Sequence, residues 1–238
     1  MYSDFLIIIP TYNERTNIEI LLEGIARFRT ESSHEYQVLV VDDGSPDNTG
    51  KFINEISLSW VKLLQRERKA GLGNAYKAGF EWAIEHNFQF VIEMDADGSH
   101  RIEDLQNLLT ANREIDLVLG SRWIESGRIL NWPWYRRLLS LGGNSYARLA
   151  LGLPIKDMTS GYRRIKVSAL RRVNFRTLST KGYGFQIEMV SQFNEFNLTI
   201  IEVPITFIER TIGQSKMTIG IAVEAWKTVT KLGLKRLR

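Results

Sequence analysis

The first 120 residues of this chain alternate between short apolar runs and segments of helical periodicity, and this alternation limits the possible folds more than any other feature. The apolar runs have the length of strands and lie at residues 5–9, 38–41, 60–64, 90–94 and 117–119. Runs of Val, Ile and Leu without intervening polar residues are typical of parallel strands that are buried on both faces. The alternation therefore predicts an α/β fold with a Rossmann-like, mostly parallel central sheet flanked by helices.

The remaining segments predict where the helices lie. Apolar spacing predicts a helix over residues 18–28, opened by a capping box of Thr16 and Glu19, and further helices over 73–87 and 101–113. In the second half, patterning predicts amphipathic and other helices over 128–153 (after Pro133), 163–175, 183–197 and 217–238, and a strand over 199–209. No linker rich in Gly, Ser or Pro interrupts the chain, so we expect a single domain.

Composition excludes several classes of site. The chain has no cysteine, which rules out disulfides and thiolate metal sites, and His34, His86 and His100 show no ligand spacing. Any metal is therefore expected to be a hard ion bound by oxygen. A net charge of +4 is too small to indicate nucleic-acid binding. Without a signal peptide or an apolar window of about 18 residues, the chain is expected to be cytosolic, free or bound to a membrane surface.

Polar clusters follow three of the predicted strands, at the edge where open parallel sheets bind ligands. They are Pro10 to Glu14, Asp42 to Ser45, and Asp95 to Asp97. Asp95 and Asp97 are two residues apart, which directs both carboxylates to the same side, where they can hold Mg²⁺ or Mn²⁺ against a diphosphate. Two solvated turn aspartates are the alternative for an isolated pair of this kind, and the two other acidic strand ends favour the metal site.

Asp42 and Asp43 admit several interpretations. They could ligate a metal, accept hydrogen bonds from a base or ribose, or form an Asx-type turn with Gly44 and Ser45, and the last two roles are compatible. Gly71-Leu72-Gly73 opens a helix whose N–H groups could face phosphate. Tyr76 stands where a dinucleotide fingerprint requires glycine, and no Walker motif occurs, so nicotinamide redox chemistry and P-loop hydrolysis are poor interpretations.

Taken in order, the segments 10–14, 41–45, 71–76 and 95–97 resemble those of the inverting family 2 glycosyltransferases, which have the GT-A fold. Later segments narrow the resemblance to the dolichol-phosphate (polyprenol monophosphate) mannose synthases; these are residues 120–122, 136–140, 157–163 and 213–217. The resemblance covers residues 5 to about 217. It implies inverting transfer of mannose from GDP-mannose to a polyprenyl phosphate, with Mg²⁺ or Mn²⁺ as cofactor.

The resemblance also implies roles by position. For the nucleotide sugar, these fall on Pro10, Tyr12, Glu14, Val40, Asp42, Asp95, Ala96, Asp97, Arg122, Arg210 and Lys216. Within that set, Asp95, Asp97, Arg122 and Arg210 are the implied catalytic residues, and Asp95, Asp97 and Ser99 the implied metal ligands. Arg136 and Ser140 would hold the acceptor phosphate, and Gln186 and Glu188 could face the sugar. The implied GT-A domain spans 1–238, with a nucleotide-sugar part over about 1–122 and an acceptor- and membrane-facing part over about 123–238.

The implied acceptor suits the residues near the site. A hydroxyl acceptor usually needs a general base, whereas a phosphate monoester is already anionic and can attack once arginines position it. UDP-glucose or UDP-N-acetylglucosamine as donor, to the same lipid or to a saccharide, remains an alternative. A non-enzymatic basic surface module is a more remote one.

Two segments are typical of membrane contact. Residues 129–139 combine Trp, Tyr and paired Arg with apolar residues, although a buried aromatic cluster would look the same. From residue 219 onward, one apolar helical face accompanies a basic stripe of Lys227, Lys231, Lys235 and Arg238, although a packed terminal helix with a solvated face is an equal alternative. Some family members add transmembrane helices after the catalytic domain, whereas we expect this chain to rely on surface contact or on a separate partner. We therefore expect peripheral attachment at the cytoplasmic face of a membrane, with or without a separate membrane protein partner.

Overall fold

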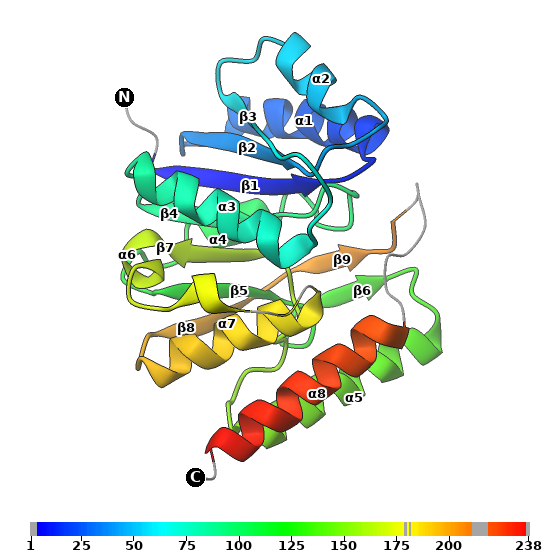
Figure 1. Cartoon of the computed structure of the whole chain (residues 1–238), viewed down its shortest axis with the longest axis vertical. Helices are drawn as coiled ribbons and strands as arrows, with labels where there is room; N and C mark the ends of the chain where they lie inside the picture. The colour runs from blue at the N-terminus through cyan, green and yellow to red at the C-terminus, as the bar shows by residue number, and fades with distance from the viewer. Residues whose placement is uncertain (1–3, 179, 181, 211–218, 237–238) are drawn as a thin grey trace.

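A seven-stranded sheet runs through the computed structural model, which describes residues 4–178, 180, 182–210 and 219–236 (Figure 1). The strand order is β3-β2-β1-β4-β7-β5-β8. The strands are β1 (Phe5–Thr11), β2 (Tyr36–Asp42), β3 (Val61–Gln65), β4 (Phe90–Glu93), β5 (Leu117–Ser121), β7 (Arg163–Lys166) and β8 (Ile200–Pro204). All run in one direction except β7, which is antiparallel to both of its neighbours. The predicted α/β fold with a mostly parallel sheet is therefore confirmed.

Helices cover both faces of this sheet because successive residues of its strands point to opposite sides. Leu6 and Ile8 of β1 belong to one apolar core, and Ile7 and Ile9 to the other. The first core is closed by α3 (Leu72–Glu85), α5 (Trp134–Leu151), α6 (Val167–Leu170), α7 (Tyr183–Glu195) and α8 (Ile219–Arg236), and the second by α1 (Arg15–Glu31), α2 (Thr49–Glu55) and α4 (Leu105–Leu109). A 3₁₀ turn, η1 (Phe175–Thr177), precedes α7.

The chain order places a topological switch between β1 and β4. From β1 the chain moves outward to β2 and β3, and then crosses to β4 on the other side of β1. Ligands of open α/β sheets bind beyond the carboxyl ends of the strands at such a switch, because the connecting loops diverge there. The clusters after β1, β2 and β4 all lie at this edge.

The predicted helix over 163–175 is wrong at its start. Residues 163–166 form β7, which pairs with β4 on one side and β5 on the other, and a helix begins only at Val167. The charged sequence Arg163-Arg164-Ile165-Lys166 does not resemble a buried strand, since arginine is rarely buried without a partner. Here Arg164 is fully buried, and its guanidinium donates 2.6 Å hydrogen bonds to the carbonyls of Ala111 and Asn112 just after α4.

Other boundaries also differ from the predictions. Glu14, and not Thr16, is the N-cap of α1; it makes no side-chain cap hydrogen bond, and Glu19 pairs with Arg15 instead of closing a capping box. The helix predicted over 101–113 is limited to α4, and α2 was not predicted.

The strand predicted over 199–209 divides at Ile205. Its second part, β9 (Thr206–Ile208), leaves the large sheet and pairs with β6 (Arg128–Leu130) in a separate two-stranded sheet. The amphipathic helix predicted after Pro133 is confirmed, because α5 begins at Trp134 directly after this proline, while residues 128–130 of the same segment form β6.

Helices α5 and α8 lie side by side and run in the same direction beside the sheet (Figure 1). Tyr146 of α5 stacks on Trp226 of α8 with ring centroids 6.5 Å apart, and its hydroxyl is 2.8 Å from Thr230 Oγ1. Among the described residues, no helix combines the length and the apolar character that spanning a bilayer requires. Residues 217, 218 and 237–238 of the predicted terminal helix lie outside the described residues.

We predict that Arg164→Ala destabilises the protein by about 3 kcal/mol, because it leaves buried carbonyls after α4 without their donor. Urea denaturation followed by circular dichroism measures the change in the free energy of unfolding. Arg171→Ala is the matched control, since Arg171 is exposed and makes a single contact with the Ile84 carbonyl. Equal stabilities of the two variants would contradict a structural role for the buried arginine.

Candidate functional site

Three segments that are distant in sequence meet at the carboxyl edge of the sheet. Thr11 at the end of β1 is paired with Asp42 at the end of β2, and β4 ends at Glu93, two residues before Asp95. The antiparallel strand β7 begins at this same edge, so the loop that precedes it, residues 157–162, also reaches the site. A helix in place of β7 would not have delivered this loop there.

Asp42 is fully buried and organises the turn that follows β2. Its Oδ1 accepts hydrogen bonds from the hydroxyls of Thr11 (2.9 Å) and Ser45 (2.5 Å). Its Oδ2 accepts from the Ser45 N–H (3.0 Å) and the Gln65 amide (2.8 Å). The turn interpretation of Asp42 is therefore confirmed, while its contact with a nucleoside stays a prediction.

The other residues predicted at the nucleoside end lie nearby. Pro10 and Tyr12 are half-buried, and the Lys69 ammonium lies 4.3 Å from the centroid of the Tyr12 ring. Glu14 is buried and accepts a 2.6 Å hydrogen bond from Asn17, and Val40 lies within β2 without exposed surface. These residues surround the ends of β1 and β2, and their roles toward a nucleotide stay predictions.

Asp43 fixes the start of α3 next to this turn. Its carboxylate forms a 2.7 Å ion pair with Arg66 and accepts the Ala70 N–H at 3.0 Å. Gly71 follows with φ of 95°, a conformation that favours glycine, and caps α3. The first turn of this helix is thereby held close to the carboxyl edge of the sheet.

Asp97 is held in an ionised state by its neighbours. Arg210 lies 2.9 Å from Asp97 Oδ2, and the Ser99 N–H donates to Oδ1 at 3.1 Å. Burial alone would raise the pKa of Asp97, but hydrogen bonding from Ser99 and the charge of Arg210 lower this pKa below its ordinary value. Gly98, which lies between Asp97 and Ser99, has a φ of 74°. The tight turn at this glycine keeps Asp95, Asp97 and Ser99 together on one loop.

His100 is a site residue that the sequence analysis missed. Its Nδ1 accepts the Asp95 N–H at 3.1 Å, which leaves the ring proton on Nε2, 3.9 Å from Asp95 Oδ2. The ring stacks on Tyr162 with centroids 4.7 Å apart, and burial lowers the pKa of His100 despite the nearby aspartates. The available signal was a histidine five residues after Asp95 in the same loop, and the spacing between the three histidines does not reveal it.

The oxygen donors in this loop fit a hard divalent cation. Two carboxylates, Asp95 and Asp97, lie on it, and the buried Ser99 Oγ has no hydrogen-bond partner among the described residues. In the described part of the chain, no three or more His, Cys, Asp or Glu side chains are grouped so that they alone could hold a metal ion. Magnesium commonly binds through one or two carboxylates and completes its shell with water and substrate phosphates, so this donor set is sufficient.

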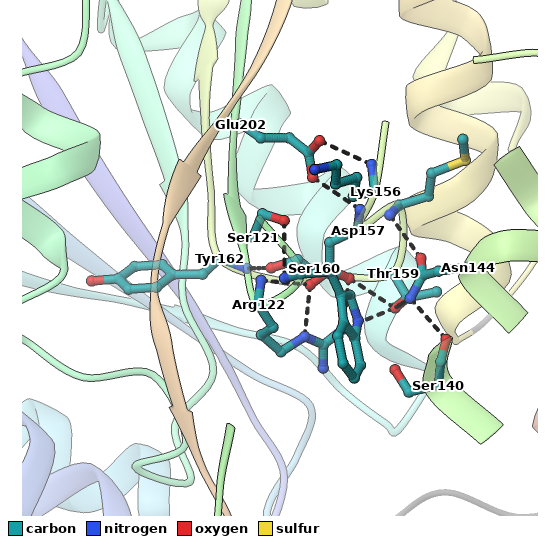
Figure 2. A network of polar contacts seen from close by, with 12 residues as sticks. Ser121, Arg122, Ser140, Asn144, Lys156, Asp157, Thr159, Ser160, Tyr162 and Glu202 are labelled. Carbon is teal, nitrogen blue, oxygen red and sulfur yellow. Dashed lines mark hydrogen bonds and ion pairs between the residues drawn. The ribbon is translucent and has the colours of Figure 1, made fainter. Parts of the chain in front are cut away.

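Arg122 is held by a buried ion pair that Figure 2 shows. Its Nε and Nη2 atoms donate to the two carboxylate oxygens of Asp157, each at 2.7 Å, and Nη2 also donates to Thr159 at 2.9 Å. Although burial opposes ionisation, Arg122 lowers the pKa of Asp157 below its ordinary value. Both side chains are almost completely buried, so the guanidinium is fixed in one orientation.

Asn144 connects this pair to helix α5. Its Oδ1 accepts the Met158 N–H at 2.9 Å, and its amide donates to Thr159 Oγ1 at 3.3 Å and to the Ser140 carbonyl at 3.1 Å (Figure 2). Because Asn144 is 2% exposed, these bonds are shielded from water. The helix that carries Arg136 and Ser140 is thus joined to the loop that holds Arg122.

A second buried network lies beneath Asp95. The Gln186 amide donates to Glu93 at 2.7 Å, and Arg163 lies 4.0 Å from the same carboxylate oxygen. Burial raises the pKa of Glu93 to about 7, although Arg163 and Gln186 oppose the shift. Gln186 therefore contacts Glu93, and Glu188 accepts a 2.6 Å hydrogen bond from Thr180; their predicted contact with a sugar stays untested.

Arg136 and Ser140 line a pocket of about 220 Å³ between α5, α7, α8 and the loops that follow β5 and precede β7. The pocket also contains Arg122, Trp132, Leu139, Gly143, Tyr146, Thr159, Ile187, Ala225, Trp226 and Val229. The Trp132 ring lies between the two arginines, 5.5 Å from Arg122 Cζ and 4.4 Å from Arg136 Cζ. The pocket therefore has a cationic end and mostly apolar walls.

The structure thus brings together most of the predicted site residues. Asp97 contacts Arg210 directly, and Arg122 and Arg136 line the same pocket. The Phe207 ring connects the two groups, because it lies 5.2 Å from Arg122 Cζ and packs edge-on against His100. Lys216 and the segment 213–217 lie outside the described residues.

Comparisons with known proteins agree with this architecture. Residues 6–173 match the family described as Glycosyl transferase family 2. The chain is 46% identical over 231 residues to an undecaprenyl-phosphate mannosyltransferase of Micrococcus luteus, covering 96% of this chain and 93% of that protein. It is 41% identical over 234 residues to a polyprenol monophosphomannose synthase of Mycolicibacterium smegmatis, covering 97% and 87%, respectively.

Solved structures show the same fold at low sequence identity. Glucosyl-3-phosphoglycerate synthase from Mycobacterium tuberculosis, in complex with Mn²⁺, UDP-glucose and phosphoglyceric acid, superposes with a TM-score of 0.67 at 18% identity, covering 97% of this chain and 80% of that chain. The same enzyme with Mg²⁺ and UDP gives a TM-score of 0.66, also at 18% identity, and is covered to 79%. This likeness establishes the GT-A fold for the present chain.

We expect Asp97→Asn to weaken Mn²⁺ binding by at least about 100-fold, because it removes a charged oxygen donor while keeping the side-chain shape. Titration of Mn²⁺ followed by electron paramagnetic resonance of the free ion measures the affinity. Glu85→Gln serves as the control, since Glu85 is exposed at the far end of α3. Unchanged Mn²⁺ affinity in Asp97→Asn would remove this loop as the metal site.

Proposed function

This chain belongs to glycosyl transferase family 2, and we propose that it transfers mannose from GDP-mannose to the phosphate of a polyprenyl phosphate, with inversion at the anomeric carbon. The chain is a glycosyltransferase, and the donor, the acceptor and the stereochemistry are what the proposal adds. The observation that carries it is the pocket beside the metal-binding loop, which joins a cationic end to apolar walls.

The pocket fits an anionic lipid headgroup better than a sugar hydroxyl. Arg122, Arg136 and Ser140 supply donors at one end, which suits a phosphate group. The apolar walls, which include Leu139, Ile187 and aromatic rings, suit the first part of a hydrocarbon chain. Removing the apolar surface of this chain from water would stabilise the bound lipid. The names of the two relatives, an undecaprenyl-phosphate mannosyltransferase and a polyprenol monophosphomannose synthase, support the same acceptor class.

On the donor side, the residues after β1, β2 and β4 would hold the nucleotide sugar. Pro10, Tyr12, Glu14, Val40 and Asp42 surround the place for the nucleoside. A divalent cation, Mg²⁺ or Mn²⁺, held by Asp95, Asp97 and Ser99, would neutralise the diphosphate of the leaving group. Arg210 would then leave the Asp97 carboxylate and bind phosphate oxygens of the donor instead. We propose that Arg122 and Lys216 contact the phosphates as well.

The reaction needs little proton transfer from the protein. An acceptor phosphate is anionic near neutral pH, so its oxygen can attack the anomeric carbon once it is positioned. Arg136 and Ser140 lie one helical turn apart on α5 and would orient that oxygen. Attack in line with the departing GDP forms the new C–O bond as the bond to the diphosphate breaks, which converts an α-linked donor into a β-linked product.

The two halves of the chain would divide this work. Residues 1–122 would bind the nucleotide sugar, and residues 123–238 would face the acceptor and the membrane. Six large apolar side chains of α5 are exposed, among them Trp134 (73%) and Leu149 (82%), with Tyr135, Leu138, Leu139 and Leu141. Such a surface supports peripheral attachment to a membrane, and we propose that the face is the cytoplasmic one, where the headgroup of a polyprenyl phosphate would be accessible.

A donor and acceptor screen tests the reaction. With Mg²⁺ and a short polyprenyl phosphate, we expect mannosyl transfer from GDP-mannose, with a β-linked product identified by NMR. UDP-glucose and UDP-N-acetylglucosamine should give little product, and the free polyprenol should not be an acceptor. Transfer from UDP-sugars alone would overturn the mannose assignment.

A vesicle-binding measurement tests the membrane surface. The double variant Trp134→Ser, Leu138→Ser should bind vesicles containing phosphatidylglycerol about tenfold more weakly, because two exposed apolar side chains are lost. Ile20→Ser is the matched control, since Ile20 is 54% exposed on α1, far from α5 in the chain. Equal binding by the double variant and the control would show that α5 does not contact the bilayer.

A further inference from the structure

Two consecutive residues, Glu209 and Arg210, form ion pairs on both sides of the site. They follow β9, and successive residues of an extended chain point in opposite directions. Arg210 contacts Asp97 in the metal-binding loop, and Glu209 contacts Arg136 on α5. One short stretch of backbone therefore carries a partner for the donor side and a partner for the acceptor side.

The pair of Arg136 and Glu209 has the geometry of an occupied anion site. Arg136 Nη1 contacts both carboxylate oxygens of Glu209, at 2.5 Å for Oε1. The two side chains are only 14% and 24% exposed, and the Trp132 ring covers the guanidinium at 4.4 Å. A carboxylate in this position presents to Arg136 the same kind of charged oxygen pair that a phosphate would present.

We propose that Glu209 occupies the place of the acceptor phosphate on Arg136 as an internal competing carboxylate, which the phosphate must displace in order to bind. This inference rests on the proposed function, because Arg136 is the residue assigned to the acceptor phosphate. It adds a role for Glu209: the internal carboxylate keeps Arg136 paired in the free protein and weakens binding of the acceptor phosphate by competing for the same guanidinium.

The physical basis is the cost of leaving a shielded guanidinium without an anion. A phosphate monoester can replace the carboxylate with charge-assisted hydrogen bonds, so the exchange conserves the pairing of Arg136. A neutral hydroxyl carries no charge that could replace the carboxylate, so its binding leaves the pair of Arg136 and Glu209 intact.

The fold around Glu209 does not depend on its carboxylate. The backbone N–H of Glu209 donates to the Leu130 carbonyl at 3.2 Å, and the pairing of β6 with β9 is made by backbone atoms. Glu209→Gln keeps these bonds and the shape of the side chain while removing the charge. This variant should therefore fold like the wild type, which urea denaturation can confirm.

The decisive measurement is calorimetric binding of farnesyl phosphate in detergent, without a nucleotide sugar. Glu209→Gln should bind it about three- to tenfold more tightly than the wild type, because the competing carboxylate is gone. Farnesol, which has the same chain without phosphate, should gain nothing. Glu195→Gln, an exposed carboxylate variant on α7 that loses its contact with Lys235, should match the wild type.

The outcomes separate this inference from the proposed function. Equal or weaker binding of farnesyl phosphate by Glu209→Gln overturns the role of Glu209 alone, as does an equal gain for farnesol. Absence of binding by both proteins overturns the acceptor assignment and this inference with it. If Glu209→Gln binds farnesyl phosphate more tightly but the wild type does not transfer mannose from GDP-mannose, the role of Glu209 is supported and only the proposed donor is overturned.

Discussion

The buried ion pair between Arg122 and Asp157 connects the parts of this protein on which the site depends. Arg122 follows β5, Asp157 lies in the loop before β7, and Thr159 and Asn144 extend the contacts to α5. An ion pair of this kind is not a strong source of stability, because desolvation offsets most of the attraction. Its geometric effect is larger, since removing either partner would leave a buried charge without compensation. The pair thus fixes the position of helix α5 relative to the sheet.

Charges in the site are paired within the protein. Asp97 is paired with Arg210 and Arg136 with Glu209, in addition to Arg122 with Asp157. Pairing keeps each side chain in an extended, oriented state and avoids the cost of isolated charges in a shielded pocket. A substrate that enters must then exchange one partner for another. Such exchanges favour ligands that carry the matching charge, in agreement with a nucleotide diphosphate on one side and a phosphate on the other.

The pairing of α5 with α8 completes the pocket at its apolar end. Tyr146 and Trp226 stack across the two helices and line the walls, while Val229 is buried between them. The apolar face predicted for residues 219–237 is therefore divided, because Val229 packs inward whereas Val223 and Trp226 remain largely exposed. Periodicity alone does not distinguish these two environments, since both require apolar residues at helical spacing.

The sequence by itself determined the parallel half of the sheet and the acidic strand ends, because buried parallel strands and carboxylates at their ends are local patterns. It also placed Asp95, Asp97, Arg122 and Arg210 in one site through their resemblance to known motifs. Only the tertiary structure decided that residues 163–166 form a strand, because the buried arginines there are stabilised by carbonyls from distant segments. The same holds for His100 beside Asp95 and for Glu209 on Arg136. Their roles arise from individual side-chain contacts, within one loop for His100 and with helix α5 for Glu209, and such contacts leave no periodic signal in the chain.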